Sequence, residues 1–171
     1  MGKGVTLLAV LLVAWLTYTP SPIWAQEGYQ PEALFLSIYL DGNVAFEYSV
    51  KVDPSLPKLS VSLFGQVYQN IVVLNEAGTP LEYELIKGGL SIFTLGSSML
   101  KISYITSDLV GKAGRVWTLA VDSPINLTVR IPRDATITGL SQIPLAINTV
   151  DGDYLISMPQ GRQEVSYLSL I

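Results

Sequence analysis

The sequence predicts an all-β fold: a mainly antiparallel β-sandwich that forms a single domain over residues 34–171. Apolar and polar residues alternate with a period of two in several short segments, as in residues 44–52, where every second side chain is apolar. Glycine, proline, aspartate and asparagine separate these segments, and no segment after the first 25 residues has helical periodicity. This pattern is typical of roughly eleven to thirteen short strands in a sandwich or barrel.

The N-terminal segment has the layout of a secretory signal. Lys3 supplies a positive charge, Val5–Leu16 is an apolar run, and two prolines precede a cleavage site after Ala25. The apolar run is shorter than the roughly 17–25 residues that a membrane span needs, which favours cleavage over a retained anchor. We expect residues 1–25 to be a signal peptide or an N-terminal membrane anchor, followed by an extended lead-in over residues 26–33. The domain is then extracytoplasmic, either secreted or held at the membrane by its N-terminal segment.

The first strands predict a hairpin with a defined register. Leu34–Leu40 and Val44–Val52 each place their apolar side chains on one face. A two-residue turn would set the apolar face of one strand against the polar face of the other. A three-residue loop, Asp41-Gly42-Asn43, brings the two apolar faces together by pairing Ile38 with Phe46, and three-residue loops with one left-handed position are common.

The remaining elements follow the same pattern. Val67–Leu74 is a mostly apolar run, which predicts a strand buried on both faces. Further strands are expected at residues 59–63, 81–85, 90–95, 100–104, 117–121, 127–131, 136–140, 145–150, 154–158 and 164–171. Trp117 is expected to mark the core, because Leu119 and Val121 share its face. The last run, Val165–Ile171, either pairs within the domain or is donated to a neighbouring copy.

Composition excludes several kinds of chemistry. The sequence has no cysteine and no histidine, which removes disulfides, thiol catalysis, every His-dependent triad and most transition-metal sites. The net charge of −4 and the absence of a basic cluster argue against nucleic-acid binding. We expect no catalytic residue, no metal and no cofactor.

Three groups of polar residues are candidate sites. Glu82 and Glu84 lie on one strand face, where paired carboxylates can act as acid and base, but here a solvated strand face is favoured. Two loops, Asp41-Gly42-Asn43 and Asp151-Gly152-Asp153, are rich in oxygen ligands, but they lack the EF-hand spacing of a calcium site and suit hairpin turns.

A basic connection contains several glycines and could bind an anion. It lacks the spacing of a phosphate-binding loop, which favours a solvated loop. Its residues are Gly111, Lys112, Gly114 and Arg115.

One motif predicts a modification. Asn126-Leu127-Thr128 is the sole N-glycosylation sequon. Alternation places Asn126 on the face opposite Leu127, so the acceptor amide is expected to be exposed. Asn126 is therefore a candidate glycosylation site.

Part of the chain resembles a known but poorly characterised family. The resemblance covers about residues 99–171 and lies in Tyr104–Leu109, Lys112, Gly114, Val116–Leu119, Ile131-Pro132, Ala135–Ile137, Pro159–Gly161 and Val165–Tyr167. Together these resemble an extracytoplasmic β-domain of archaeal membrane and cell-surface proteins. That domain often precedes a C-terminal membrane span and sometimes a cytoplasmic helix-turn-helix module. This sequence shows neither pattern, so the resemblance implies an extracytoplasmic β-domain but no signalling role, and it implies no catalytic residues.

These observations favour a non-enzymatic extracytoplasmic module that binds a protein partner, or copies of itself, at the cell surface. The alternative is a self-assembling filament or envelope subunit that exchanges strands with its neighbours. A hydrolase built on carboxylates or serine is a third hypothesis, for which no motif is present.

Overall fold

Alternating side chains form strands along nearly the whole of residues 28–169, the part of the chain described by the computed structural model. Fourteen strands and no helix occur in this range, so the predicted all-β, mainly antiparallel sandwich is confirmed. The strands are β1 (Tyr29–Ile38), β2 (Val44–Val52), β3 (Lys58–Ser62), β4 (Gln69–Asn75), β5 (Tyr83–Ile86), β6 (Gly89–Phe93), β7 (Met99–Thr106), β8 (Val110–Ala113), β9 (Val116–Ser123), β10 (Leu127–Ile131), β11 (Ala135–Leu140), β12 (Ala146–Val150), β13 (Asp153–Met158) and β14 (Gly161–Ser169). The signal or anchor expected over residues 1–25 lies outside the described residues.

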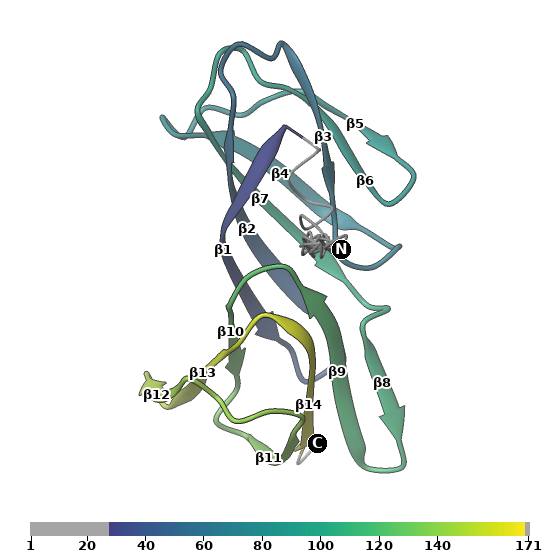
Figure 1. The fold of residues 1–171 in the computed structure, drawn as a ribbon. Coiled ribbons are helices and arrows are strands. Elements are labelled where there is room, and N and C mark those ends of the chain that lie inside the picture. The colour runs from purple at the N-terminus through teal and green to yellow at the C-terminus, as the bar shows by residue number, and fades with distance from the viewer. Residues whose placement is uncertain (1–27, 170–171) are drawn as a thin grey trace, which may run out of the picture.

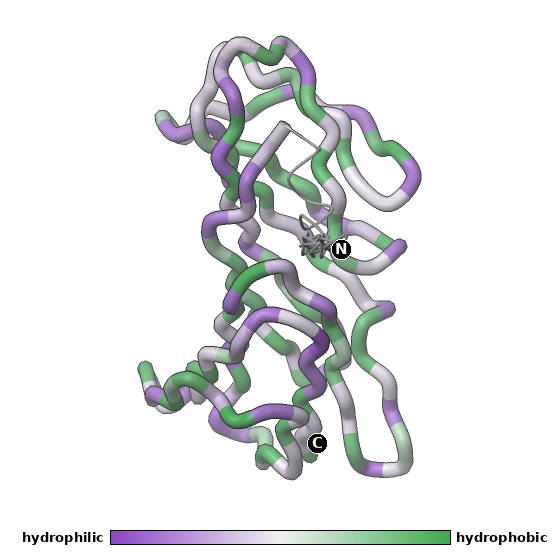
Figure 2. The backbone as a smooth tube through the Cα atoms, viewed as in Figure 1, coloured by the Kyte–Doolittle hydropathy of each residue, from purple (hydrophilic) through white to green (hydrophobic). Residues whose placement is uncertain are grey.

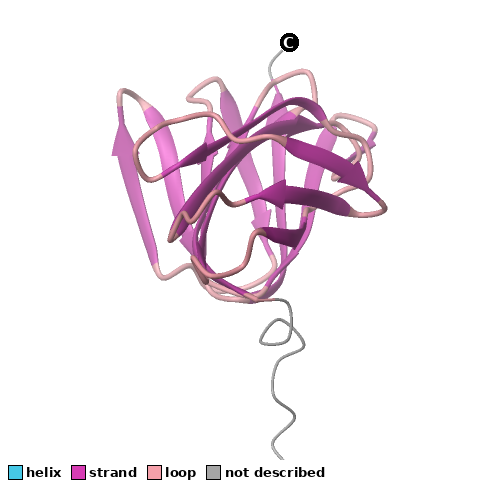
Figure 3. Ribbon diagram, turned by 90° about the horizontal axis from the view of Figure 1, so that it is seen from above, coloured by secondary structure: helices cyan, strands magenta, loops and turns pink. Residues whose placement is uncertain are grey.

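Three sheets build the domain. The largest has seven strands in the order β12-β13-β10-β1-β2-β7-β4, a second has the order β11-β14-β9-β8, and a third has the order β3-β6-β5. The three-stranded sheet lies at one end of the long sheet and the four-stranded sheet at the other (Figure 1). Seen from above, the strands curve around a shared interior (Figure 3). β1 and β10 pair in parallel, and every other strand pair is antiparallel.

The core lies where the inner faces of these sheets meet. Along β2, alternate side chains from Val44 to Val52 are buried, as the period of two predicts. Phe46 stacks on Tyr104 with ring centroids 5.0 Å apart, and on Phe64 at 5.5 Å. Burying each large apolar side chain contributes about 1.5–3 kcal/mol, so this aromatic cluster is a main support of the domain.

The first hairpin has the predicted loop length but not the predicted register. Its three-residue loop is residues 40–42, closed by a hydrogen bond from the Tyr39 N–H to the Asn43 carbonyl at 2.9 Å. Ile38 therefore faces Val44 and not Phe46, which corrects the prediction by one loop position. Both registers bring the apolar faces together, so burial alone cannot choose between them. Gly42 decides the register because it takes the left-handed position of the loop, at φ +86°.

The prediction for Val67–Leu74 was wrong about burial. β4 begins only at Gln69, lies at the edge of the seven-stranded sheet and buries Val73 alone. A bulge between Gln69 and Val72, with Asn70 at φ +54°, interrupts its pairing with β7. An apolar run does not tell a central strand from an edge strand, because both present apolar residues to at least one covered face.

Both terminal strands lie inside their sheets. β1 lies between β10 and β2, and β14 lies between β11 and β9. β1 begins within the segment 26–33 that was expected as a lead-in, because Tyr29 pairs with Val52 and buries its ring. Val165 and Tyr167 point into the core from β14. The last strand therefore pairs within the domain over its described residues.

Candidate interaction surface

The strand β12 contributes no buried side chain to the core. It forms one edge of the seven-stranded sheet, and β13 is its only partner among the strands of residues 28–169. Figure 1 shows it at the outer margin of the domain, on the side away from β8. All five of its residues are exposed. The sheet thus ends in a strand with one open side.

Apolar side chains gather on and beside this edge. Ile143 is 87% exposed, Leu145 59% and Ile147 55%, and Val150 and Tyr154 are exposed as well. Several hydrophobic positions are visible in the corresponding projecting segment of Figure 2. Ile147 pairs with Ile156, which is fully buried, so both lie on the inner face of the sheet. The opposing layer covers Ile156 but does not reach Ile147. We call residues 143–150 the apolar edge.

The main chain of the apolar edge is also available. The Leu145 N–H donates to the Ser157 carbonyl at 2.8 Å, so this carbonyl points toward β12. The opposite residue, Ala146, therefore belongs to the hydrogen-bonded set, and the pattern repeats at every second residue of the strand. The two-residue turn Asp151-Gly152, at φ +55° and +90°, agrees with this assignment, because the two residues that flank such a turn form a hydrogen-bonded pair. It follows that Ile147 and Thr149 direct their N–H and C=O groups away from β13, toward the open side.

The other sheet edges of the described residues are protected against pairing with a further strand. Edge strands are usually protected by charges, bulges or a covering segment. β3 carries Lys58, β5 carries Glu84 and β8 carries Lys112. β4 and β11 are bulged, and Leu81 donates to the Val73 carbonyl of β4 at 2.9 Å. β12 has neither a charge nor a register shift. Its edge is thus the one in the described chain that lacks these protections.

One of the two aspartates at the β12–β13 turn is paired with an arginine. Asp153 follows the turn, and its Oδ2 lies 2.7 Å from Arg130 Nη2. The Arg133 N–H and the Arg130 guanidinium hold the pKa of the Asp153 carboxyl below its ordinary value. Asp153 is therefore ionised and paired at neutral pH. Asp151, at the turn itself, is the other acidic residue beside the strand, and the Arg133 side chain lies against the adjacent Gly152.

A separate cavity lies at the other end of the domain. It has a volume of about 620 Å³ and is lined by Gly65, Gln66, Tyr68 and residues 85–88. The Asp108 carboxylate fixes one wall, because its Oδ2 accepts hydrogen bonds from the N–H groups of Gln66 and Val67. The tip of the β5–β6 hairpin forms the other wall. The Asp108 carboxylate thus holds in place the loop that lines the cavity.

The carboxylates singled out in the sequence have separate partners, although the Gly42 loop and the β8–β9 hairpin meet at Trp117. Glu82 and Glu84 are exposed, and Glu84 Oε2 accepts from Lys58 Nζ at 2.7 Å. Asp41 caps its own turn, since its Oδ1 accepts from the Asn43 N–H at 3.0 Å. Asp153 pairs with Arg130, as described above. Among residues 28–169, no cluster of three or more carboxylates suitable for a metal ion occurs.

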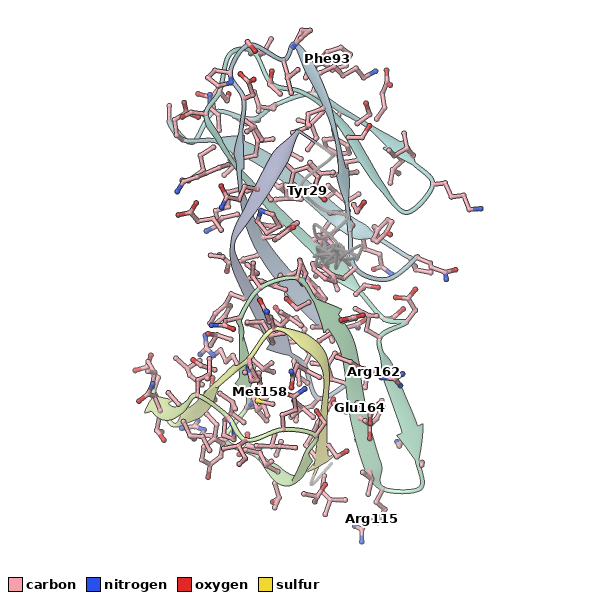
Figure 4. All side chains as sticks on the ribbon, viewed as in Figure 1. Tyr29, Phe93, Arg115, Met158, Arg162 and Glu164 are labelled. Carbon is pink, nitrogen blue, oxygen red and sulfur yellow. The ribbon has the colours of Figure 1, made fainter. Side chains whose placement is uncertain are left out.

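The β8–β9 hairpin places the basic residues and Trp117. Residues 114 and 115 form its turn, and Figure 4 shows Arg115 projecting away from the body at the tip. Lys112 Nζ lies 4.3 Å from the centroid of the Trp117 ring. Trp117 itself is half-buried and packs against the core, so it lies at the margin of the core between the hairpin and the Gly42 loop.

The glycosylation candidate is placed at the start of β10. Asn126 is exposed, and its Oδ1 accepts a hydrogen bond from the Gln160 N–H at 3.0 Å. Thr128 lies on the same face, and its hydroxyl is 3.3 Å from that of Ser157. Glycosylation of Asn126 stays a prediction.

The sequence predicted a strand near β12 but not its role. A signal was present: residues 135–150 contain no charged side chain, although they include two strands. That signal also fits a buried strand. Only the extent of the opposing layer shows that Ile143, Leu145 and Ile147 are uncovered. Among the described residues, no helix is long and apolar enough to cross a membrane.

Comparisons with known proteins show the fold alone. No protein-family model matches the chain, and no curated protein matches it. Solved structures are similar at low identity. They include the M1 zinc metallopeptidase of Deinococcus radiodurans (TM-score 0.51, 12% identity) and a variant of it bound to a Tyr-Ser-Ala substrate (TM-score 0.53, 11% identity). A two-domain M1 zinc metallopeptidase variant bound to L-tryptophan is also similar (TM-score 0.52, 12% identity).

The similarity extends over 84% of this chain but only 42–43% of those structures. The chain thus spans less than half the length of these proteins. At this identity the likeness establishes a shared β-sandwich arrangement and transfers no activity.

Proposed function

We propose that this protein is a non-enzymatic extracytoplasmic module that binds a protein partner at the cell surface through the apolar edge of β12. The observation that carries the proposal is an unprotected sheet edge with exposed apolar side chains over residues 143–150. Contiguous exposed apolar surface in a folded domain marks an interaction site or an aggregation hazard, and a strand edge adds main-chain hydrogen bonding to it.

The extracytoplasmic location rests on the sequence. Residues 1–25 have the layout of an export signal, and the resemblance over residues 99–171 is to domains of archaeal surface proteins. The domain needs no cofactor for this role, since a strand edge binds by pairing and apolar contact. Glycosylation at Asn126 is compatible with it, because Asn126 and the apolar edge are separate segments.

The geometry gives less support to strand exchange. A donor strand must leave its own sheet, and both β1 and β14 have partners on two sides. Releasing β14 would also expose Val165 and Tyr167, which are buried. Binding at the open edge of β12 requires no such unfolding.

A position-specific crosslinking experiment tests the proposed function. A photoreactive residue replaces Leu145 in the full-length protein expressed in cells, and the matched control replaces Leu95, which is 78% exposed at a distant turn. We expect protein adducts from position 145 and not from position 95. Equal adduct formation at both positions, or none at either, contradicts the proposal.

A further inference from the structure

The apolar edge is complementary to the same edge of a second copy of the chain. We propose that two copies of this chain pair antiparallel along β12, with Asn148 on the two-fold axis, so that two seven-stranded sheets become continuous. This inference rests on the proposed function, because it names the partner of the same edge. Homodimers with two-fold symmetry are the commonest soluble assemblies, and such an interface uses the same patch on both copies.

The open main-chain groups select the register. Ile147 and Thr149 are the β12 residues whose N–H and C=O groups point away from β13. When Asn148 lies on the axis, Ile147 of one copy faces Thr149 of the other, and the reverse pair forms as well. Each is then a hydrogen-bonded pair, and all the outward groups of the two residues are used. A shift of one residue would set outward groups opposite inward ones and lose these bonds.

The side chains match in the same register. Facing residues of antiparallel strands lie on the same side of the sheet. On the inner face, Ile147 therefore meets the methyl-bearing Thr149 of the other copy. On the outer face, Ala146 meets Val150, and the two Asn148 amides meet each other. The uncovered apolar side chains Leu145 and Ile147 of both copies then form one continuous surface across the axis.

Charge does not oppose this pairing. Residues 135–150 contain no charged residue, so no like charges face each other within the paired segment. Asp151 lies in the β12–β13 turn, outside the paired segment. Asp153 is held by Arg130 and Arg133 of its own copy. An edge that lacks the charges and bulges of the other edges is thus complementary to itself, and a second copy presents the same edge wherever the protein is present.

Cysteine reporters test the register directly, because the sequence contains no cysteine. Two Asn148→Cys residues would lie opposite each other as a pair without main-chain hydrogen bonds, with Cα atoms about 4.5 Å apart, within disulfide reach. Two Ala146→Cys residues would be offset by four positions, about 13 Å, which is too far for a disulfide. Under mild oxidation we expect a disulfide-linked dimer from Asn148→Cys and not from Ala146→Cys.

Light scattering across a concentration series tests the pairing without a crosslink. We expect the mass of the unsubstituted full-length protein to rise to that of two chains. Ile147→Lys places a cation on each side of the axis and should weaken this dimer about tenfold or more. The matched control, Leu95→Lys, makes the same charge change at a distant exposed site and should leave the dimer intact. Circular dichroism and thermal melting of each variant confirm that the fold is kept.

Two results overturn the self-pairing, and they differ from failure of the proposed function. A one-chain mass at every concentration, together with no disulfide from Asn148→Cys, excludes the dimer. Equal crosslinking of Asn148→Cys and Ala146→Cys shows random collision. If position 145 then gives a photoadduct with a different protein, the edge is a binding site but its partner is not a second copy. If it gives no specific adduct at all, the proposed function fails as well.

Discussion

Adding one methyl group at Gly42 tests how the first hairpin is held against the β8–β9 hairpin. Gly42 has φ +86°, and a Cβ built on it would lie 2.5 Å from Cζ3 of Trp117. The tryptophan cannot withdraw freely, because it packs against the core on one side and carries the Lys112 ammonium over its ring. Gly42→Ala should therefore combine backbone strain with a steric clash.

The magnitude follows from two contributions. A left-handed conformation costs a non-glycine residue about 1–2 kcal/mol. Forcing an extra carbon into a packed contact costs about 1–3 kcal/mol more. The expected loss is about 2–5 kcal/mol in the free energy of unfolding, measured by urea denaturation with far-UV circular dichroism. Gly78→Ala is the matched control, because Gly78 has φ +76° and no atom within 4 Å of the added carbon. Gly78→Ala should lower the free energy of unfolding by the backbone-strain contribution alone.

The reasoning can be refuted in two ways. If Gly42→Ala and Gly78→Ala cost the same, then Trp117 does not press against the loop. In a Trp117→Ala background, Gly42→Ala should cost no more than the control. A full cost in that background would place the clash elsewhere.

Three further predictions concern the loop, the core and the surface. Asp108→Ala removes a carboxylate that accepts from two backbone N–H groups and a threonine hydroxyl, and should lower the free energy of unfolding by about 1–2 kcal/mol; an unchanged urea midpoint would contradict this. Burial, with the charge of Asp41, raises the pKa of Tyr167 to about 12 in the folded protein, against about 10 unfolded. The folded state is thus favoured below pH 10, and stability should fall between pH 10 and 12 by up to about 1.4 kcal/mol per pH unit. Tyr167→Phe should lessen this decline, to which Tyr104 also contributes because burial raises its pKa. The substitution should not destabilise the protein at pH 7, because the Tyr167 hydroxyl is buried without a hydrogen-bond partner among the described residues; a steep loss at pH 7 would refute this. Asn126→Gln should remove the glycan mass from the protein expressed in cells, and two forms whose masses differ only by the methylene that glutamine adds, measured by mass spectrometry, would show that the sequon is unused.

Local pattern in the sequence predicted much of the fold. Residues 44–52 alternate in sequence, and β2 alternates in burial over the same residues. The loop length between β1 and β2 was also predicted correctly, because both apolar faces had to coincide. The choice of register was not, since it depends on which residue takes the left-handed position. Gly42 takes it at the end of the loop, where the prediction had centred the loop on it.

Properties set by distant contacts were beyond prediction. The parallel pairing of β1 with β10 joins Leu34 to Leu127 across most of the domain, and no local pattern encodes it. The apolar edge shows the same limit. Ile147 and Ile156 are both isoleucines on one face of one sheet, yet one is 55% exposed and the other fully buried. The difference lies in how far the opposing layer extends, which is a property of the assembled domain. Figure 4 likewise shows Met158, two residues after Ile156, inside the fold.

Amide hydrogen exchange at two residues of β12 tests the account most directly. The outward N–H groups of Ile147 and Thr149 have no partner strand among residues 28–169 of one copy, whereas those of Ala146 and Asn148 point toward β13. If the edge pairs with a second copy, exchange at Ile147 and Thr149 should be fast in dilute solution and slow markedly as the concentration rises. Fast exchange at both residues at every concentration, with Ala146 and Asn148 protected throughout, would show that the edge stays open and that two copies do not pair along it.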